Sequence, residues 1–412
     1  MLISNHEIGM QFSKQLTLSF LTVIIFLFGC GRDMPTDLKS ESELKVKIGH
    51  AAPLTGTQAN LGQDNEGGAI LAIEEANASG IVIGGKKIQF QLLSEDDQAD
   101  PRIGTIVAHR LVDAEISGMI GHLNSGTTIP ASRIYHDAGI PQISPSATSP
   151  KYTQQGFKSA FRIMANDEQQ GKVLGKFATQ QLAAKSVAII DDRTAYGQGI
   201  ADEFEKSVSV SGGNIVAREF TTDKSTDFLA ILTAIKGRKP DLLFFGGMVS
   251  QGGPMMKQIK SLGIDAKFLS GDGIYNPEFI KLAGDAAEGA YASLPGLPLD
   301  RMPNGISFRN EYRAKYRREI QLYAPFCYDA VNIMIEAMKR ADSVEPEKYL
   351  PELAKTNYNG VTSRIVFDGK GDLEGGAITL YKVKNGQWEV VEIFLESQPP
   401  KAVTTSFIDK RG

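Results

Sequence analysis

Apolar runs of strand length alternate with amphipathic runs of helix length along most of this chain. Strands that follow one another through a helical crossover must run parallel, so this order predicts an α/β fold built on parallel sheets. In the first series the predicted strands are 46–52, 88–93, 116–120 and 140–143, and the predicted helices are 64–78 and 101–114.

The alternation restarts after Ala165, which predicts a second sheet. A chain of 412 residues is also longer than a single core normally supports. We therefore expect two lobes, each built on a doubly wound parallel sheet. The second series has predicted helices 169–182, 197–210, 227–236 and 254–262 and strands 186–190, 214–220, 242–246 and 267–269; beyond Gly289 follow a strand, helices 306–320 and 328–341, and strand-like runs 364–367, 378–383 and 388–394.

The N-terminal segment is typical of an exported protein. Residues 16–28 form an uncharged apolar run that is too short for a permanent membrane span but matches the core of an export signal. The run ends in Leu-Phe-Gly-Cys, which resembles the bacterial lipobox, where cleavage leaves the cysteine as a lipid-modified first residue. We expect a signal peptide at 1–29, a tether at 30–44, and a lipid on Cys30 that anchors the protein on the extracytoplasmic side of a membrane. A buried helix that ends in cysteine is the alternative reading, and Met10 is an alternative start.

Composition and motifs argue against several classes of protein. A formal net charge of -4 gives no electrostatic basis for binding nucleic acid. The histidines and cysteines lack the spacing of a metal site, and no Gly-x-Ser-x-Gly or Gly-x-Gly-x-x-Gly motif stands where a hydrolase or a dinucleotide fold needs it. With Cys30 lipidated, Cys327 has no partner for an intramolecular disulfide and is expected to be a buried, inert thiol. We expect no enzyme activity, no cofactor and no metal.

Hydroxyl residues gather where two predicted strands end. Gly-His-Leu-Asn-Ser-Gly-Thr-Thr, which contains Ser125, follows the strand at 116–120, and Ser-Pro-Ser-Ala-Thr, which ends at Thr148, follows the strand at 140–143. Backbone N–H groups at the start of a helix lack partners, so hydroxyls beside them can hold a carboxylate or a phosphate. No phosphate-loop lysine accompanies either cluster, which favours a small carboxylate ligand. Taken singly, Ser125 and Thr148 are more commonly helix N-caps. The neighbouring His122 has no evident acid partner in the sequence and is expected to be a hydrogen-bonded wall residue.

The strands of the second series end in residues of complementary polarity. Tyr196 follows one of these strands, and Ser-Gly-Asp-Gly, which contains Asp272, follows another. In open α/β sheets the ligand lies beyond the carboxyl ends of the strands. A zwitterion would fit between hydroxyls on one lobe and a carboxylate with an aromatic ring on the other. Asp272 as a turn residue and Tyr196 as ordinary packing are the alternatives.

Five short motifs follow one another in a characteristic order and spacing: Pro53-Leu54-Thr55-Gly56, 121–132, 143–148, 192–197 and 283–289. Together they resemble the periplasmic-binding-protein type I family, specifically the leucine/isoleucine/valine-binding proteins of ABC importers. The resemblance runs from Lys45 to about Leu395 and implies two lobes that are joined by three crossovers and close on the ligand. The implied segments are 45–165 plus 296–376 for the N-terminal lobe, 166–295 plus 377–400 for the C-terminal lobe, and 401–412 for a tail.

The resemblance also implies individual roles in ligand binding. Ser125 and Thr148 match the hydroxyl residues that hold the ligand α-carboxylate, and Asp272 matches the acid that pairs with the α-ammonium. Tyr196 matches an aromatic residue from the second lobe. Backbone contacts or pocket wall are implied for Leu123, Asn124, Ser146 and Ala147, and the positions of the usual aromatic walls hold Leu61 and Met248.

The implied function is that of an extracytoplasmic receptor of an ABC importer, expected to be a monomer. It would bind a hydrophobic or branched-chain amino acid and deliver it to a permease driven by ATPase subunits. Leu61 and the polarizable Met248 imply a wider range of accepted side chains, because a pocket distinguishes one methylene by only about 1–3 kcal/mol. Two alternatives stay open: a sensory receptor of the same fold, and, less favoured, an α/β hydrolase whose nucleophile and base the sequence does not reveal.

Overall fold

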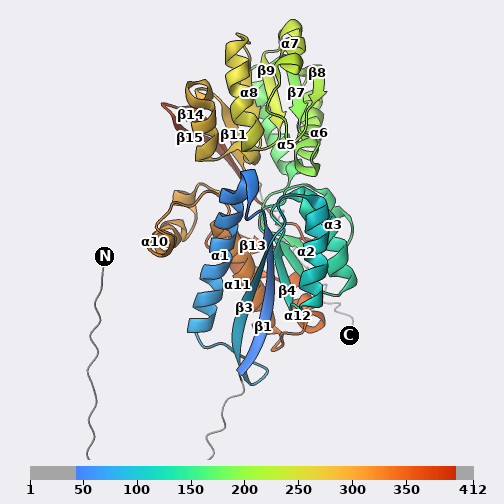
Figure 1. Cartoon of the computed structure of the whole chain (residues 1–412), viewed down its shortest axis with the longest axis vertical. Helices are drawn as coiled ribbons and strands as arrows, with labels where there is room; N and C mark the ends of the chain where they lie inside the picture. Colours follow the sequence, from blue (N-terminus) through green and yellow to red (C-terminus); the bar gives the residue numbers. More distant parts are fainter. Residues whose placement is uncertain (1–42, 396–412) are drawn as a thin grey trace, which may run out of the picture. The chain divides into compact units, whose positions relative to one another are not determined.

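The computed structural model describes residues 43–395 (Figure 1). The predicted signal peptide, Cys30, the tail 401–412 and all but the end of the predicted tether lie outside the described residues. None of the helices between residues 43 and 395 combines the length and the apolar character needed to cross a bilayer.

The first series of strands forms a sheet, as predicted, and two short edge strands that the sequence analysis did not predict bring it to six strands. The central strands are apolar on both faces because helices cover both of them. The terminal strand pair at one edge is antiparallel and the other four pairs are parallel. The strands lie in the order β2 (Val82–Ile83), β3 (Lys86–Asp96), β1 (Glu43–Ala52), β4 (Gly118–Gly121), β5 (Gln142–Ser144) and β6 (Ala160–Arg162).

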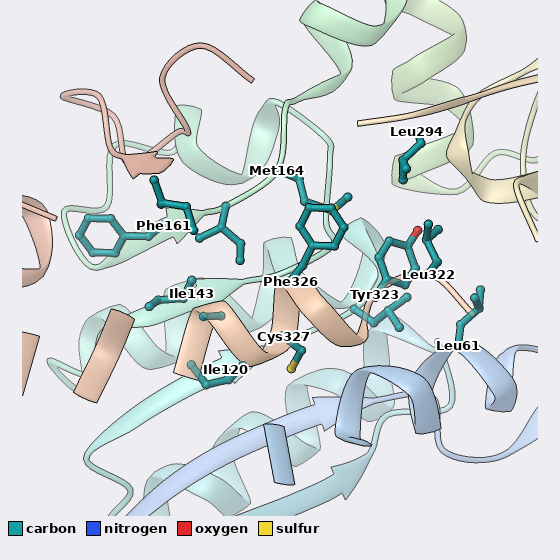
Figure 2. Close-up of a cluster of buried hydrophobic side chains, with 14 of the residues drawn as sticks. Leu61, Ile120, Ile143, Phe161, Met164, Leu294, Leu322, Tyr323, Phe326 and Cys327 are labelled. Carbon is teal, nitrogen blue, oxygen red and sulfur yellow. The ribbon is translucent and has the colours of Figure 1, made fainter. Parts of the chain in front are cut away.

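Two pairs of helices cover the two faces of this first sheet. Successive residues of a strand point to opposite faces, and Ile120 and Met119 of β4 accordingly belong to different apolar clusters. Met119 packs with residues of α2 and α3, whereas Ile120 packs with residues of α1 and α11 (Figure 2). These helices are α1 (Ala59–Ala78), α2 (Pro101–Asp113), α3 (Ser125–Asp137) and α11 (Ala324–Arg340).

The pairing of α1 with α11 joins segments that are far apart in the sequence. Gly68 makes it possible, because a Cβ atom there would lie 2.1 Å from the carbonyl oxygen of Ala324. The first sheet is therefore completed by residues that follow the second series of strands. The same part of the chain contains α10 (Gly305–Tyr316), α12 (Pro346–Ala354) and the separate antiparallel pair of β12 (Asn357–Asn359) and β13 (Arg364–Val366).

The second sheet has seven strands, and antiparallel strands at one edge extend the predicted parallel sheet. A hairpin at the C-terminus of the described chain adds two antiparallel strands to its edge. The hairpin turn is Asn385-Gly386, and both residues have positive φ, as a two-residue turn between twisted strands requires. The strand order is β15 (Gln387–Leu395), β14 (Ala377–Lys384), β11 (Tyr291–Leu294), β10 (Lys267–Ser270), β9 (Leu242–Gly246), β7 (Ser186–Asp191) and β8 (Asn214–Phe220).

Helices also flank the second sheet (Figure 1). The chain passes between the two sheets three times: after β6, after β11 and before β14. Three crossovers between two sheets agree with the predicted fold class. The helices of this part are α5 (Asp167–Lys176), α6 (Ala195–Val210), α7 (Leu229–Arg238), α8 (Val249–Ser261) and α9 (Pro277–Ala283), and α4 (Lys151–Gln154) precedes β6.

Helix ends account for most differences from the predicted elements. α1 begins at Ala59, five positions before the predicted start, and its N-cap Gln58 makes no side-chain capping bond that would mark the site in the sequence. α10 ends at Tyr316 because Arg317 adopts a left-handed conformation with φ of 52°. α5 ends at Lys176 and continues as a π-helical turn.

Cys327 lies in the core of the first half of the fold, on α11 (Figure 2). Its side chain is completely buried, and burial raises the pKa of the thiol well above its usual value. A neutral buried thiol is a poor nucleophile. The prediction that Cys327 is a buried packing residue is therefore confirmed.

Candidate functional site

The two predicted hydroxyl clusters lie side by side in the structure. β4 and β5 are adjacent parallel strands, so the loops that follow them leave the sheet at the same edge. The Ser146 hydroxyl donates to the carbonyl of Leu123 at 3.0 Å, and the backbone N–H of Ser149 donates to Ser125 Oγ at 3.2 Å. The loops are thus tied together by their own serines, and Ser125 is the first residue of α3.

A buried arginine holds the second of these loops from behind. Arg162 of β6 is completely buried, and its Nη1 donates to the carbonyls of Ala147 and Ser149 at 3.0 and 2.8 Å. The C=O and the following N–H of a trans peptide point in opposite directions, so the Thr148 N–H faces away from the guanidinium. Sequence reasoning missed Arg162, although a charged residue inside the apolar run 160–165 was a signal for it.

Asp272 occupies the start of the turn that follows β10 of the second sheet. Its carboxylate is buried and accepts three side-chain hydrogen bonds. Gln170 Nε2 and the Tyr196 hydroxyl donate to Oδ1 at 3.2 and 3.0 Å, and the Tyr323 hydroxyl donates to Oδ2 at 3.0 Å. Burial raises the pKa of Asp272, and these three hydrogen bonds oppose that shift.

Tyr196 is fixed at the start of α6. The Thr194 hydroxyl caps this helix by accepting from the N–H of Gly197 at 2.9 Å. Besides donating to Asp272, the Tyr196 hydroxyl accepts from the N–H of Gly273 at 2.8 Å. The predicted aromatic residue and the predicted acid therefore form one rigid unit, in which the phenol ring is almost fully buried.

Asp167 and Gln170 of α5 connect Thr148 to Asp272. The Asp167 N–H donates to the Thr148 carbonyl at 2.9 Å, and Gln170 Nε2 lies 3.2 Å from Oδ1 of both Asp167 and Asp272. Burial raises the pKa of Asp167 well above its usual value, the nearby Asp272 raises it further, and the adjacent Thr148 side chain lowers it. The hydroxyl loops and the acid predicted from sequence thus meet in one continuous buried network, which contains three further residues that the sequence analysis missed: Asp167, Gln170 and Tyr323.

The remaining predicted site residues are buried, except Asn124, which is half-buried. Leu61 of α1 and Met248, which precedes α8, are 2% and 6% exposed. Asn124 Nδ2 donates to Gln58 Oε1 at 2.8 Å, so this side chain points to the start of α1. The Ala147 side chain is also buried, beside the carbonyl that Arg162 holds.

His122 is hydrogen-bonded, as expected, and one of its partners is an acid that the sequence did not reveal. Its Nδ1 lies 2.8 Å from Asp97 Oδ2, and its Nε2 lies 3.1 Å from the Tyr135 hydroxyl. All three side chains are buried. Both ring nitrogens are engaged, so His122 acts here as a structural residue behind the hydroxyl loop. Within residues 43–395 no group of three or more histidine, cysteine or carboxylate side chains has the arrangement of a metal site.

Asp192, at the end of β7, gives a prediction for the pH dependence of stability. Thr194 donates to Oδ1 through its N–H and hydroxyl at 2.9 and 2.6 Å, whereas Oδ2 is buried without a hydrogen-bond partner among the described residues. Burial raises the pKa of Asp192 to about 6. Because protonation then favours the folded state, this stabilisation is present below pH about 4 and is lost as the pH rises through about 6.

We expect Asp192→Asn to remove the loss of stability that ionisation of Asp192 causes as the pH rises. Between pH 4 and 7 the free energy of unfolding of the unchanged protein should fall relative to that of the variant, by up to about 3 kcal/mol. Urea unfolding at several pH values would measure the difference. Parallel curves for the two proteins would contradict the prediction.

The fold defines a class of proteins with two sheet-bearing halves joined by three crossovers, and comparison with known proteins identifies the family. Residues 45–387 match the family model described as periplasmic binding protein, and the chain belongs to this family. It is 33% identical over 337 residues to the leucine-, isoleucine-, valine-, threonine-, and alanine-binding protein of Pseudomonas aeruginosa, which covers 82% of this chain and 89% of the relative.

Solved structures agree with this assignment. The leucine-binding protein LivK of Thermotoga maritima is 27% identical with a TM-score of 0.79, over 84% of this chain and 98% of that one. The branched-chain amino acid transporter substrate-binding protein LivJ of Streptococcus pneumoniae, solved with isoleucine, is 30% identical with a TM-score of 0.77, over 85% and 100%.

Proposed function

We propose that this protein is the substrate-binding receptor of an ABC importer and that its ligand is a hydrophobic amino acid. The observation that carries the proposal is the buried network that joins Asp272 to the hydroxyl loops of Ser125 and Thr148. The relatives that match this chain are named for binding leucine, isoleucine and valine. The same network would bind the two charged ends of an amino acid.

The two ends of the site have complementary polarity. Hydroxyl and N–H donors suit the ligand carboxylate because they bring no counter-charge that must itself be desolvated. The ligand ammonium needs an anion, and Asp272 supplies one on the opposite side. Hydrogen bonds to charged groups contribute about 1.5–3 kcal/mol each, so a few such bonds at each end are enough for tight binding.

Leu61 and Met248 support an apolar pocket for the ligand side chain. Both are buried members of the same core cluster, and neither brings a hydrogen-bonding group. Methionine adapts its shape to different partners. We therefore propose that leucine, isoleucine, valine and larger apolar amino acids bind with affinities that differ by less than about 3 kcal/mol.

Binding is proposed to close two lobes over the ligand. The N-terminal lobe comprises 45–165 plus 296–376 and the C-terminal lobe 166–295 plus 377–400; each contains one of the two sheets. Ligand can favour closure only by binding the closed form more tightly. The closed monomer, held outside the cytoplasm by a lipid on Cys30, would then deliver the amino acid to a permease with ATPase subunits.

Titration calorimetry on the purified protein tests the ligand assignment. Leucine should bind, whereas leucinamide, which lacks the carboxylate, and 4-methylpentanoate, which lacks the ammonium, should each bind at least about 30-fold more weakly. Equal affinity for leucine and either analogue would overturn the assignment. A sensory receptor would give the same titration, and purified permease that fails to take up leucine in the presence of this protein would favour that alternative.

A further inference from the structure

Three side chains donate hydrogen bonds to Asp272, and they come from two different parts of the fold. Gln170 lies on α5 and Tyr196 on α6, and both helices belong with the second sheet, as does Asp272 itself. Tyr323 precedes α11, which packs on α1 and on β4 and β5 of the first sheet. The 3.0 Å bond from the Tyr323 hydroxyl to Asp272 Oδ2 therefore connects the two sheet-bearing halves of the molecule.

The backbone of Tyr323 is fixed by a carboxylate on another helix. Asp64 of α1 is buried and accepts the N–H groups of four consecutive residues, at 2.9, 2.9, 2.7 and 3.0 Å. Ala324 is the first residue of α11 and Tyr323 is its N-cap, and the other two N–H groups belong to the segment that leads into the helix. The Asp64 carboxylate thus binds the backbone at the start of α11 and fixes the position of the Tyr323 backbone. The four residues are Gln321, Leu322, Tyr323 and Ala324.

The ring of Tyr323 is confined by its neighbours. It is 3% exposed and belongs to the same apolar cluster as Leu61 and Leu322. Figure 2 shows the side chain leaving the start of α11 in the direction of Leu294, a residue of β11 in the second sheet. Burial also raises the pKa of the phenol well above its usual value, so the hydroxyl remains a donor at neutral pH.

Asp272 can hold both Tyr323 and a ligand ammonium. An ionised carboxylate has about four acceptor sites, two on each oxygen. Among residues 43–395, the side-chain donors to Oδ1 are Gln170 and Tyr196, and the side-chain donor to Oδ2 is Tyr323. One acceptor site on Oδ2 is thus left for the ammonium, and the Tyr323 bond need not break when the ligand binds.

We propose that Tyr323 is a latch residue, whose hydroxyl bonds Asp272 only when the two halves are closed and thereby slows the release of every amino acid to the same degree. This inference rests on the proposed function, since it assigns a positioning role within the same site. A bond that forms only after closure affects dissociation and not the first encounter with the ligand. The Tyr323 hydroxyl contacts the carboxylate of Asp272, which would pair with the ammonium of every amino acid ligand. It does not contact the pocket that distinguishes the ligand side chains.

Tyr323→Phe keeps the aromatic ring and removes the hydroxyl that bonds Asp272. Loss of one hydrogen bond to a charged group should accelerate dissociation about 10- to 100-fold, with the association rate unchanged. The factor should be the same for leucine, valine and phenylalanine. Stopped-flow chase of bound labelled amino acid by excess unlabelled amino acid would measure the rates.

Tyr316→Phe is the matched control. The Tyr316 hydroxyl donates to the Gly67 carbonyl at 2.9 Å, a bond between α10 and α1 that does not reach the second sheet. This variant should release each amino acid at the rate of the unchanged protein.

Two results would overturn the latch: unchanged dissociation from Tyr323→Phe, or acceleration for some amino acids and not others, which would make Tyr323 a wall of the side-chain pocket. Failure of the proposed function is distinguishable from both, because the unchanged protein would then bind no amino acid at all.

Discussion

Replacing Asp272 with alanine is expected to weaken leucine binding by about 2–5 kcal/mol, which is roughly 30- to 5000-fold in Kd. The substitution would leave the ligand ammonium buried without its anion. It would also leave the hydroxyls of Tyr196 and Tyr323 without their acceptor. Titration calorimetry with leucine, after circular dichroism has shown that the variant is folded, would measure the loss.

Asp272→Asn separates charge from shape in the same experiment. The amide keeps one oxygen acceptor and the size of the side chain but removes the negative charge. We expect leucine affinity to fall nearly as far as in the alanine variant, whereas 4-methylpentanoate, which has no ammonium, should bind no worse than to the unchanged protein. A folded Asp272→Ala variant that keeps its leucine affinity would show that this carboxylate does not bind the ammonium.

Asp372→Ala is expected to lower the free energy of unfolding by about 3–5 kcal/mol. Asp372 forms an ion pair with Arg162, whose side chain is completely buried, and its carboxylate also accepts from Thr153 and Asn166. Without Asp372 the guanidinium remains buried with no charged partner. Urea unfolding at neutral pH would measure the change.

Two further variants test the reason for this loss. Asp137→Ala removes an exposed carboxylate that lies 3.8 Å from Arg133, and it should change the unfolding free energy by less than about 1 kcal/mol. Adding Arg162→Met to Asp372→Ala removes the buried charge and should restore part of the stability. Leucine binding should be weaker in the double variant than in the unchanged protein, because the carbonyls of Ala147 and Ser149 lose their donor. Equal losses for Asp372→Ala and Asp137→Ala would contradict the argument.

The local pattern of the sequence was enough to locate most of the strands and the loops of the candidate site, but it missed β2, β6 and β12. β9 has the predicted bounds, because a buried strand is a short apolar run whose limits are visible in the sequence. The half-buried edge strand β8 also has the predicted bounds. Ser125, Thr148 and Asp272 could be named because polar residues directly after such runs must lie at the ligand edge of a sheet. Their convergence in one network supports that reasoning, and binding experiments remain its test.

The sequence alone determined the α/β class, the two series of strands and the polar loops at their ends, since all of these depend on neighbouring residues. Only the tertiary structure decided that Arg162 meets Asp372 across 210 positions and that Tyr323 reaches Asp272 across 51. The physical reason is that these contacts form when helices and sheets pack, and packing brings together residues whose separation in the chain carries no periodic signal.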